Sequence, residues 1–117
     1  MDLTGKHVFL SGPITGIEDY NSKAFEEAEK KAISLGATAV YNPTAQTKDK
    51  TQSHEFYMLL SISELSRLKE ELPLKPFYDY VVYLDGTEKS KGAALELFVA
   101  HEIGIKYISL EELDGQE

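Results

Sequence analysis

The sequence contains no cysteine. This absence excludes thiol nucleophiles, iron–sulfur clusters and cysteine zinc sites, and it gives no reason to assume an oxidising compartment. Basic residues are also scarce, because 12 Lys and Arg stand against 20 Asp and Glu and give a net charge of −8. Phosphate-backbone binding needs clustered positive charge, so we expect no nucleic acid partner.

Long apolar runs are absent as well. No run approaches the roughly 20 residues that a membrane span requires, and the N-terminus lacks the apolar region of a secretory signal. We therefore expect a cytoplasmic protein with no membrane partner. The length of 117 residues, without repeats or linkers, predicts a single domain over residues 1–117. We expect a solvated acidic tail at its end, formed by Glu111, Glu112, Asp114 and Glu117.

Apolar segments and helical repeats alternate along the chain. Short apolar segments predict strands over residues 7–10, 37–41, 78–84 and 105–110. Helical spacing predicts helices from about 22 to 35, 55 to 71 and 90 to 104, whereas the polar residues 44–53 predict a loop. This alternation indicates an α/β fold, a Rossmann/flavodoxin-like three-layer sandwich with a mainly parallel sheet of four or five strands.

Ligands of such sheets bind outside the carboxyl ends of the strands, which directs attention to loops 11–21, 42–53 and 85–91. The first loop contains two glycines and two hydroxyls between a strand and a helix, where bare backbone N–H groups can approach an anion. It lacks the spacing of a Walker A loop and of a dinucleotide fingerprint. On this pattern alone it is either a plain tight turn or a phosphate loop; its residues are Ser11, Gly12, Pro13, Ile14, Thr15 and Gly16.

A second candidate is the start of the helix at residues 90–104. The segment Ser90-Lys91-Gly92-Ala93 combines a capping hydroxyl, free N–H donors, the positive end of the helix dipole and a lysine. Together these groups favour an anion. The alternative is that Ser90 only caps the helix and Gly92 only allows close packing.

Glu96 lies on the same helix, on a face that would otherwise pack. Its neighbours three and four positions away are Gly92, Ala93, Val99 and Ala100, which are small or apolar. Glutamate is rarely buried without a partner, so Glu96 is either a member of a structural ion pair or a nucleophile kept dry. Because this helix is apolar on several sides, we expect it to contact a second subunit in a homodimer or higher homo-oligomer.

Other chemistries find little support. His7, His54 and His101 lack metal-ligand spacing, and we expect neither a metal nor a cofactor. No Gly-x-Ser-x-Gly elbow is present. Tyr20 and Tyr41 lie near predicted strand ends, and packing is the default role of the tyrosines.

Three segments together resemble the nucleoside 2-deoxyribosyltransferase superfamily. They are VFLSGPITG at residues 8–16, Tyr20-Asn21 with Asn42-Pro43 further on, and Asp79 ahead of EKSKGAALE at residues 88–96. The sequence is most similar to the small bacterial and phage branch, DUF4406-like, in which a "GP.TG" loop, a "YN" pair and a "W..S.GA..E" signature recur. The resemblance extends over nearly the whole chain.

This resemblance implies an activity and a site. The glutamate at the position of Glu96 attacks the sugar C1′ and forms a covalent glycosyl-enzyme, which is retaining glycosidic chemistry. Ser90, six residues earlier, implies a 2′-deoxynucleoside 5′-monophosphate or related nucleotide whose phosphate contacts Ser90 and the first loop. The other implied substrate contacts are Ser11, Pro13, Tyr20, Asn21, Asn42, Gly92 and Ala93.

The chain also departs from the superfamily pattern. Phe9 lies where the better known members have tyrosine, Ser61 where they have an aspartate that assists the leaving base, and Thr87 where the small branch has tryptophan. Glu64 or Asp79 would then have to assist, and loss of a general acid costs about 10²- to 10⁴-fold in rate. Two alternatives therefore stand beside the enzyme: a binding module for a nucleotide or NAD-derived signal, and an acidic interaction protein.

Overall fold

A computed structural model describes residues 1–14, 21–46 and 53–115. Its centre is a sheet of four strands in the order β2-β1-β3-β4, formed by β1 (His7–Ser11), β2 (Ala39–Tyr41), β3 (Tyr80–Tyr83) and β4 (Lys106–Ser109). All neighbouring strands are parallel. This confirms the predicted α/β class and the parallel sheet, with the strand order of flavodoxin-like folds.

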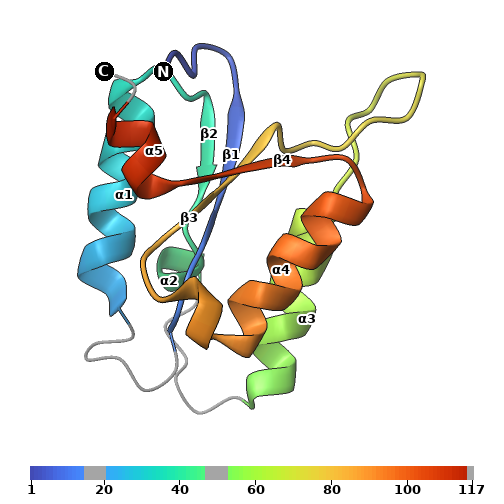
Figure 1. The fold of residues 1–117 in the computed structure, drawn as a ribbon. Helices are drawn as coiled ribbons and strands as arrows, with labels where there is room; N and C mark the ends of the chain where they lie inside the picture. Colours follow the sequence, from blue (N-terminus) through green and yellow to red (C-terminus); the bar gives the residue numbers. More distant parts are fainter. Residues whose placement is uncertain (15–20, 47–52, 116–117) are drawn as a thin grey trace.

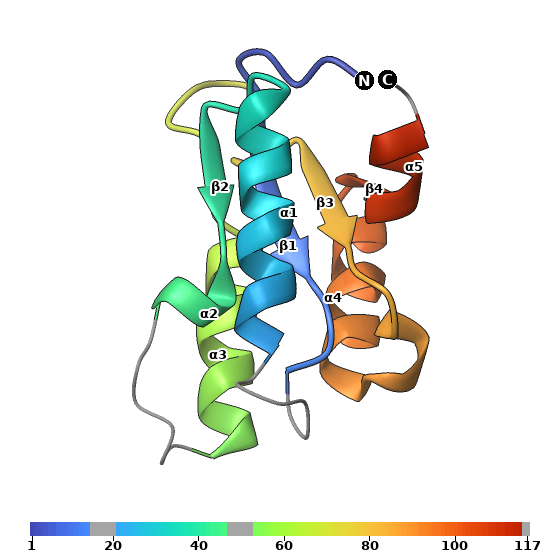
Figure 2. The same ribbon diagram turned by 90° about the vertical axis from the view of Figure 1, so that its left-hand side faces the viewer.

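Helices cover both faces of the sheet (Figures 1 and 2). Helices α1 (Ser22–Ser34) and α5 (Leu110–Gly115) lie on one face, and α3 (His54–Leu65) and α4 (Lys91–Glu102) lie on the other. The short α2 (Pro43–Gln46) follows β2, and a 3-10 turn, η2 (Thr87–Lys89), precedes α4. Among the described helices none has the length and apolar character needed to cross a membrane.

The protein has two hydrophobic cores, one on each face of the sheet. Strand β1 contributes side chains to both, because successive residues of a strand point to opposite faces. Val8 and Leu10 pack with Phe25 of α1 and with Leu113 of α5. Phe9 belongs to the second core, between the sheet and helices α3 and α4, with Leu65 as a neighbour. Ser11 ends the strand on the Phe9 side, which places its hydroxyl below α3 and α4 at the carboxyl edge of the sheet.

Helix α3 ends at Leu65, whereas the apolar spacing predicts a helix to residue 71. Beyond Ser66 the chain folds back on itself, with the N–H of Phe77 donating to the carbonyl of Arg67 (2.8 Å) and the N–H of Lys69 to that of Lys75 (3.0 Å). These long-range bonds use backbone groups that a continued helix would need. The resulting arm, residues 66–79, has a tip that projects from the body beyond the sheet (Figure 1), and it returns to the core at the buried Tyr78.

Two further segments differ from the predictions. Helix α2 occupies the first part of the expected 44–53 loop, because Asn42 accepts from the N–H of Thr44 and starts a helical turn. The expected acidic tail is helical up to Gly115; Glu111 and Glu112 are exposed as expected, but Leu113 next to them is fully buried in the core, and Glu117 lies outside the described residues. Glu112 and Ser109 exchange hydrogen bonds as a capping box, so one of the acids has a structural role.

Candidate active site

Glu96 and two serines meet where the strand order reverses. Ser11 is the last residue of β1. Strand β1 lies between β2 and β3, so the chain continues to one side of β1 with β2 and to the other side with β3. The hydroxyl of Ser11 donates to Oε1 of Glu96 across 2.6 Å. Ser61 of α3 lies close enough to the same carboxyl group to influence its pKa. Residues from β1, α3 and α4 thus converge at the switch point, the usual ligand position of this fold.

The carboxyl group of Glu96 is nearly enclosed, since the residue is only 6% exposed. Burial raises its pKa above the usual value of 4.5, while the hydroxyls of Ser11 and Ser61 act in the opposite direction. Within the described residues, the hydrogen-bond partner of this carboxyl group is the Ser11 hydroxyl, and no basic side chain pairs with it. A desolvated carboxylate without a cationic partner is suited to covalent attack on an electrophilic carbon.

The raised pKa of Glu96 predicts a pH-dependent effect of Glu96→Gln on stability. Below the usual pKa of 4.5, Glu96 is protonated in both folded and unfolded chains and contributes nothing. As pH rises from the unfolded pKa towards the raised folded pKa, the unfolded chain ionises more readily, so the wild type loses stability that the glutamine variant keeps. We expect Glu96→Gln to gain stability relative to the wild type from about pH 4 to about pH 8, measured by urea unfolding.

Glu102→Gln is the matched control for this experiment. Glu102 lies on the same helix and is exposed, so its substitution should change stability equally at both pH values. A stability difference between Glu96→Gln and the wild type that does not vary with pH would show that Glu96 is not desolvated in solution.

Tyr41 joins this site from β2, although the sequence pattern assigned it only to packing. Its ring stacks on Phe9, with centroids 4.9 Å apart, and Ser61 lies close enough to influence the pKa of its hydroxyl. Burial raises the pKa of Tyr41 to about 12, helped by the charges of Glu64 and Glu96. The signal in the sequence was its position at the end of a strand beside β1, where Tyr41 is the register partner of Phe9.

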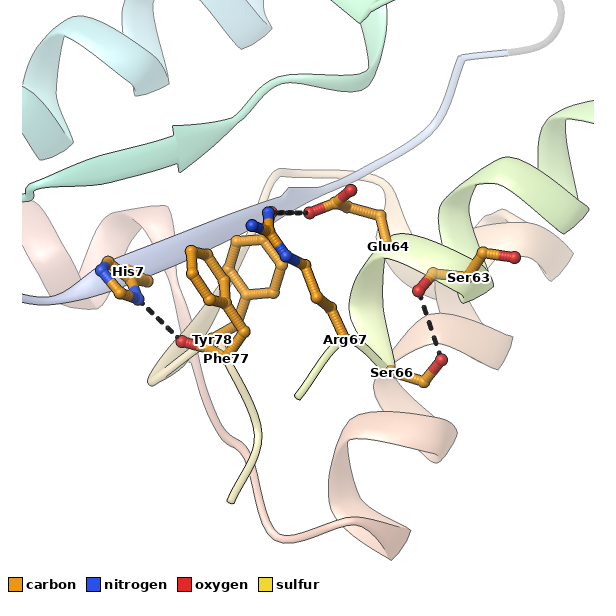
Figure 3. Close-up of polar contacts among 7 residues, drawn as sticks. All are labelled: His7, Ser63, Glu64, Ser66, Arg67, Phe77 and Tyr78. Carbon is orange, nitrogen blue, oxygen red and sulfur yellow. Dashed lines mark hydrogen bonds and ion pairs between the residues drawn. The ribbon is translucent and has the colours of Figure 1, made fainter. Parts of the chain in front are cut away.

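Glu64, the proposed helper on α3, is engaged by other side chains (Figure 3). Its carboxyl group accepts a hydrogen bond from the Tyr78 hydroxyl and pairs with Arg67 at 3.3 Å. The Arg67 guanidinium in turn lies over the Phe77 ring at 4.0 Å, and Phe77 stacks on His7 at 4.1 Å. Glu64 therefore belongs to a layer that anchors the 66–79 arm, close enough to Tyr41 for its charge to act there.

Asp79, the other proposed helper, lies at the amino edge of the sheet, away from Glu96. Its carboxyl group accepts from the backbone N–H of His7 at 2.9 Å and pairs with Lys69 at 3.7 Å. In parallel strands the residue before β3 lies beside the start of β1, whereas Ser11 is at the end of β1. The structure thus separates Asp79 from the Glu96 cluster by the length of the strands.

The described part of the first loop is closely packed. A Cβ on Gly12 would lie 2.9 Å from Cβ of Leu84, so the turn requires glycine there. The carbonyl of Pro13 accepts from Nδ2 of Asn21 at 3.0 Å, and Ile14 packs against the core. Thr15, Gly16 and Tyr20 lie outside the described residues.

The remaining predicted contacts divide into two groups. Ser90 is the N-cap of α4, and its hydroxyl accepts from the N–H of Ala93 at 3.2 Å, ahead of Gly92 in the first turn. The capping role is therefore present, and the start of α4 faces the carboxyl edge of the sheet (Figure 1). Asn42 is buried and its amide is used internally, donating to Glu29 at 3.0 Å and accepting from Thr44.

The described residues contain no group of three His, Asp or Glu side chains that could hold a metal ion. Comparison with known proteins finds no significant match among the curated proteins or the solved structures. One family model matches residues 6–109, which include Ser11, Ser61, Ser90 and Glu96. The chain therefore belongs to the family described as Domain of unknown function (DUF4406).

Proposed function

We propose that this protein cleaves or exchanges the N-glycosidic bond of a 2′-deoxynucleoside 5′-monophosphate or a related nucleotide, with Glu96 as the nucleophile. The observation that supports it most is the buried Glu96 carboxyl group, which accepts a hydrogen bond from Ser11 at the switch point of a parallel sheet. The resemblance to nucleoside 2-deoxyribosyltransferases supplies the reaction class.

In the first step an oxygen of ionised Glu96 bonds to C1′ as the C1′–N bond breaks. The base leaves with the bonding electron pair and takes a proton from solvent, because Glu64 is held by Tyr78 and Arg67. In the second step water attacks C1′, loses a proton and frees the carboxylate; an incoming base in place of water gives exchange. Both steps invert C1′, so the configuration is retained overall.

The start of α4 is the proposed phosphate end of the site. Ser90 precedes Glu96 by six residues, a rise of about 9 Å along a helix, which leaves space for a sugar between phosphate and carboxylate. The positive end of the α4 dipole and Lys91 favour an anion there. The first loop, including Gly12, is the second proposed contact for the phosphate.

The proposal is tested by incubating the protein with each deoxynucleoside 5′-monophosphate and separating the products by chromatography. We expect free base and deoxyribose 5-phosphate in equal amounts. The unphosphorylated deoxynucleosides are the matched controls and should react more slowly. Absence of free base with every nucleotide, with and without an added acceptor base, would refute the proposed activity.

One observation favours a second candidate, a nucleotide-binding module without turnover. Ser61, rather than an acid, lies beside Glu96, and Glu64 is paired with Arg67. Without proton transfer to the leaving base, the rate falls by about 10²- to 10⁴-fold. Tight binding in calorimetry, with no product over hours, would favour this candidate over the enzyme.

We also propose that the protein forms a homodimer through the outer face of α3 and α4. Phe98 is 61% exposed, and Leu95, one turn away on α4, is exposed as well. Helix α3 packs against α4 and also carries exposed leucines, Leu59 and Leu60. We expect Leu95→Glu with Phe98→Glu to convert a dimer into a monomer in light scattering coupled to gel filtration. Leu72→Glu, at a leucine that is 87% exposed on the 66–79 arm, should leave the mass unchanged. A wild-type protein that is monomeric at all concentrations would contradict the proposal.

A further inference from the structure

The hydroxyl of Ser11 lies inside the protein, with a carboxyl oxygen as its partner. Ser11 is fully buried, and its Oγ lies 2.6 Å from Oε1 of Glu96. Hydrogen bonds from a hydroxyl to an ionised carboxylate are about 2.5–2.7 Å long, shorter than those between neutral groups. Because an ionised carboxylate has no proton to give, the hydroxyl is the donor. The distance therefore fits a charge-assisted bond from Ser11 to ionised Glu96.

Both ends of this bond belong to well-anchored elements. Ser11 pairs with Tyr83 of β3, and its carbonyl accepts from the N–H of Leu84 at 2.9 Å. Glu96 lies in the middle of α4, where Ala93 and Ala100, one turn before and one turn after it, are also buried. A donor on a paired strand and an acceptor on a packed helix keep each other in one orientation.

On the face of β1 that carries Ser11, the other two side chains cannot take its place. Successive residues of a strand alternate between faces, so His7 and Phe9 share the face of Ser11. Nδ1 of His7 is hydrogen-bonded to the carbonyl of Phe77 at 2.9 Å, and the side chain of Phe9 has no polar atom. The hydroxyl of Ser11 is therefore the group through which β1 can act on the charge of Glu96.

We propose that Ser11 is a positioning residue, whose hydroxyl orients the Glu96 carboxylate and stabilises its ionised form, so that Ser11 serves the nucleophile rather than the substrate. The inference rests on the proposed function for its catalytic meaning. Burial raises the pKa of Glu96, and the Ser11 hydroxyl acts in the opposite direction. Without this donor, a larger fraction of Glu96 is protonated at a given pH, and a protonated carboxyl group does not attack C1′.

Other titratable groups around this pair stay in place when Ser11 is substituted. Tyr41 of β2 lies close enough for the charge of Glu96 to raise its pKa, and Glu64 of α3 also acts on Tyr41. Tyr83 of β3 is the register partner of Ser11 and so projects on the same face of the sheet. The other titratable side chains of η2 and α4 whose exposure the structure describes lie on the surface, namely Lys89, Lys91, His101 and Glu102.

The test is a titration of Glu96 by NMR in protein with isotope-labelled glutamate, without any substrate. The Glu96 signal is identified by its absence from the spectrum of Glu96→Gln. Ser11→Ala removes the hydroxyl, and Ser11→Thr keeps one. Ser109→Ala is the matched control, because Ser109 also ends a parallel strand and donates to a glutamate, Glu112, at 3.1 Å, but at an exposed site.

We expect the Glu96 midpoint to rise in Ser11→Ala and to stay near that of the wild type in Ser11→Thr and Ser109→Ala. In the base-release assay, kcat of Ser11→Ala near neutral pH should fall at least about tenfold with little change in KM, the factor of one hydrogen bond to a charged group. The loss should shrink at higher pH, where Glu96 ionises without the donor.

A Glu96 midpoint in Ser11→Ala equal to or below that of the wild type would overturn the inference. A midpoint raised as far in Ser11→Thr as in Ser11→Ala would overturn it too, because the hydroxyl would then have no part in the shift. Because the titration needs no turnover, it decides this inference even if the wild type releases no base, a result that would instead refute the proposed function.

Discussion

Replacing Glu96 with glutamine is expected to lower the rate of base release by at least about 1,000-fold, because the covalent step then lacks its nucleophile. Glutamine has nearly the same shape and can still accept a hydrogen bond from Ser11. Folding should therefore be preserved, which circular dichroism and the unfolding transition will show. The loss should appear in kcat, since the substitution removes chemistry and leaves the proposed phosphate contacts intact.

Glu102→Gln is the appropriate comparison for the activity of Glu96→Gln. It removes one negative charge from the same helix at an exposed position, and its rate should match that of the wild type. Equal rates for Glu96→Gln and the wild type would exclude Glu96 as the nucleophile. Base release would then need another source on the protein or in the preparation.

Phe9→Ala is expected to destabilise the protein by about 3–5 kcal/mol, the usual cost of removing a buried phenylalanine. Phe9 is fully buried in the core under α3 and α4, and its ring contacts Tyr41 and Tyr78. Its removal leaves a cavity and also frees the ring of Tyr41. The change is measured by urea unfolding monitored by circular dichroism, because the chain contains no Trp whose fluorescence could report it.

Leu72→Ala is the control for Phe9→Ala. Leu72 is exposed on the 66–79 arm, and its truncation should change the free energy of unfolding by less than about 0.5 kcal/mol. A loss below about 1 kcal/mol for Phe9→Ala would mean that the core beneath Glu96 is loosely packed. The orientation of Tyr41 by its stack on Phe9 would then have no basis.

The strands and helices α1 and α4 could be predicted, because the spacing of their apolar residues matches the residues that they bury. Phe25, Ala28 and Ala32 recur at helical intervals, and all three lie in the core beneath α1. The end of α3 could not be predicted in the same way. Leu68 continues the helical spacing but is exposed, because backbone bonds between residues 67–69 and 75–77 replace the helix.

The candidate site was predictable in part for a similar reason. Glu96 stood out because a carboxylate on a packed helix face is unusual, and Ser11 because it ends the first strand. Tyr41 stood out only by its place near a predicted strand end, and Ser61 only through the resemblance. Their position near Glu96 could not be predicted, because it depends on the pairing of β1 with β2 and on the packing of α3 beside α4. Asp79 lies shortly before residues 88–96 in the sequence, which suggested that it is near Glu96. Strand β3 separates them, because Asp79 precedes it at the amino edge of the sheet and the chain reaches the carboxyl edge only at its end.

The central claim is that Glu96 bonds covalently to the sugar of a nucleotide. Its most direct test is mass spectrometry of the intact protein, quenched in acid during turnover of a deoxynucleoside 5′-monophosphate, followed by peptide mapping. We expect a fraction of the protein to gain the mass of one deoxyribose 5-phosphate less one water, located on Glu96 and absent from Glu96→Gln. Base release accompanied by an adduct on a different residue, or by the same adduct in Glu96→Gln, would contradict the account.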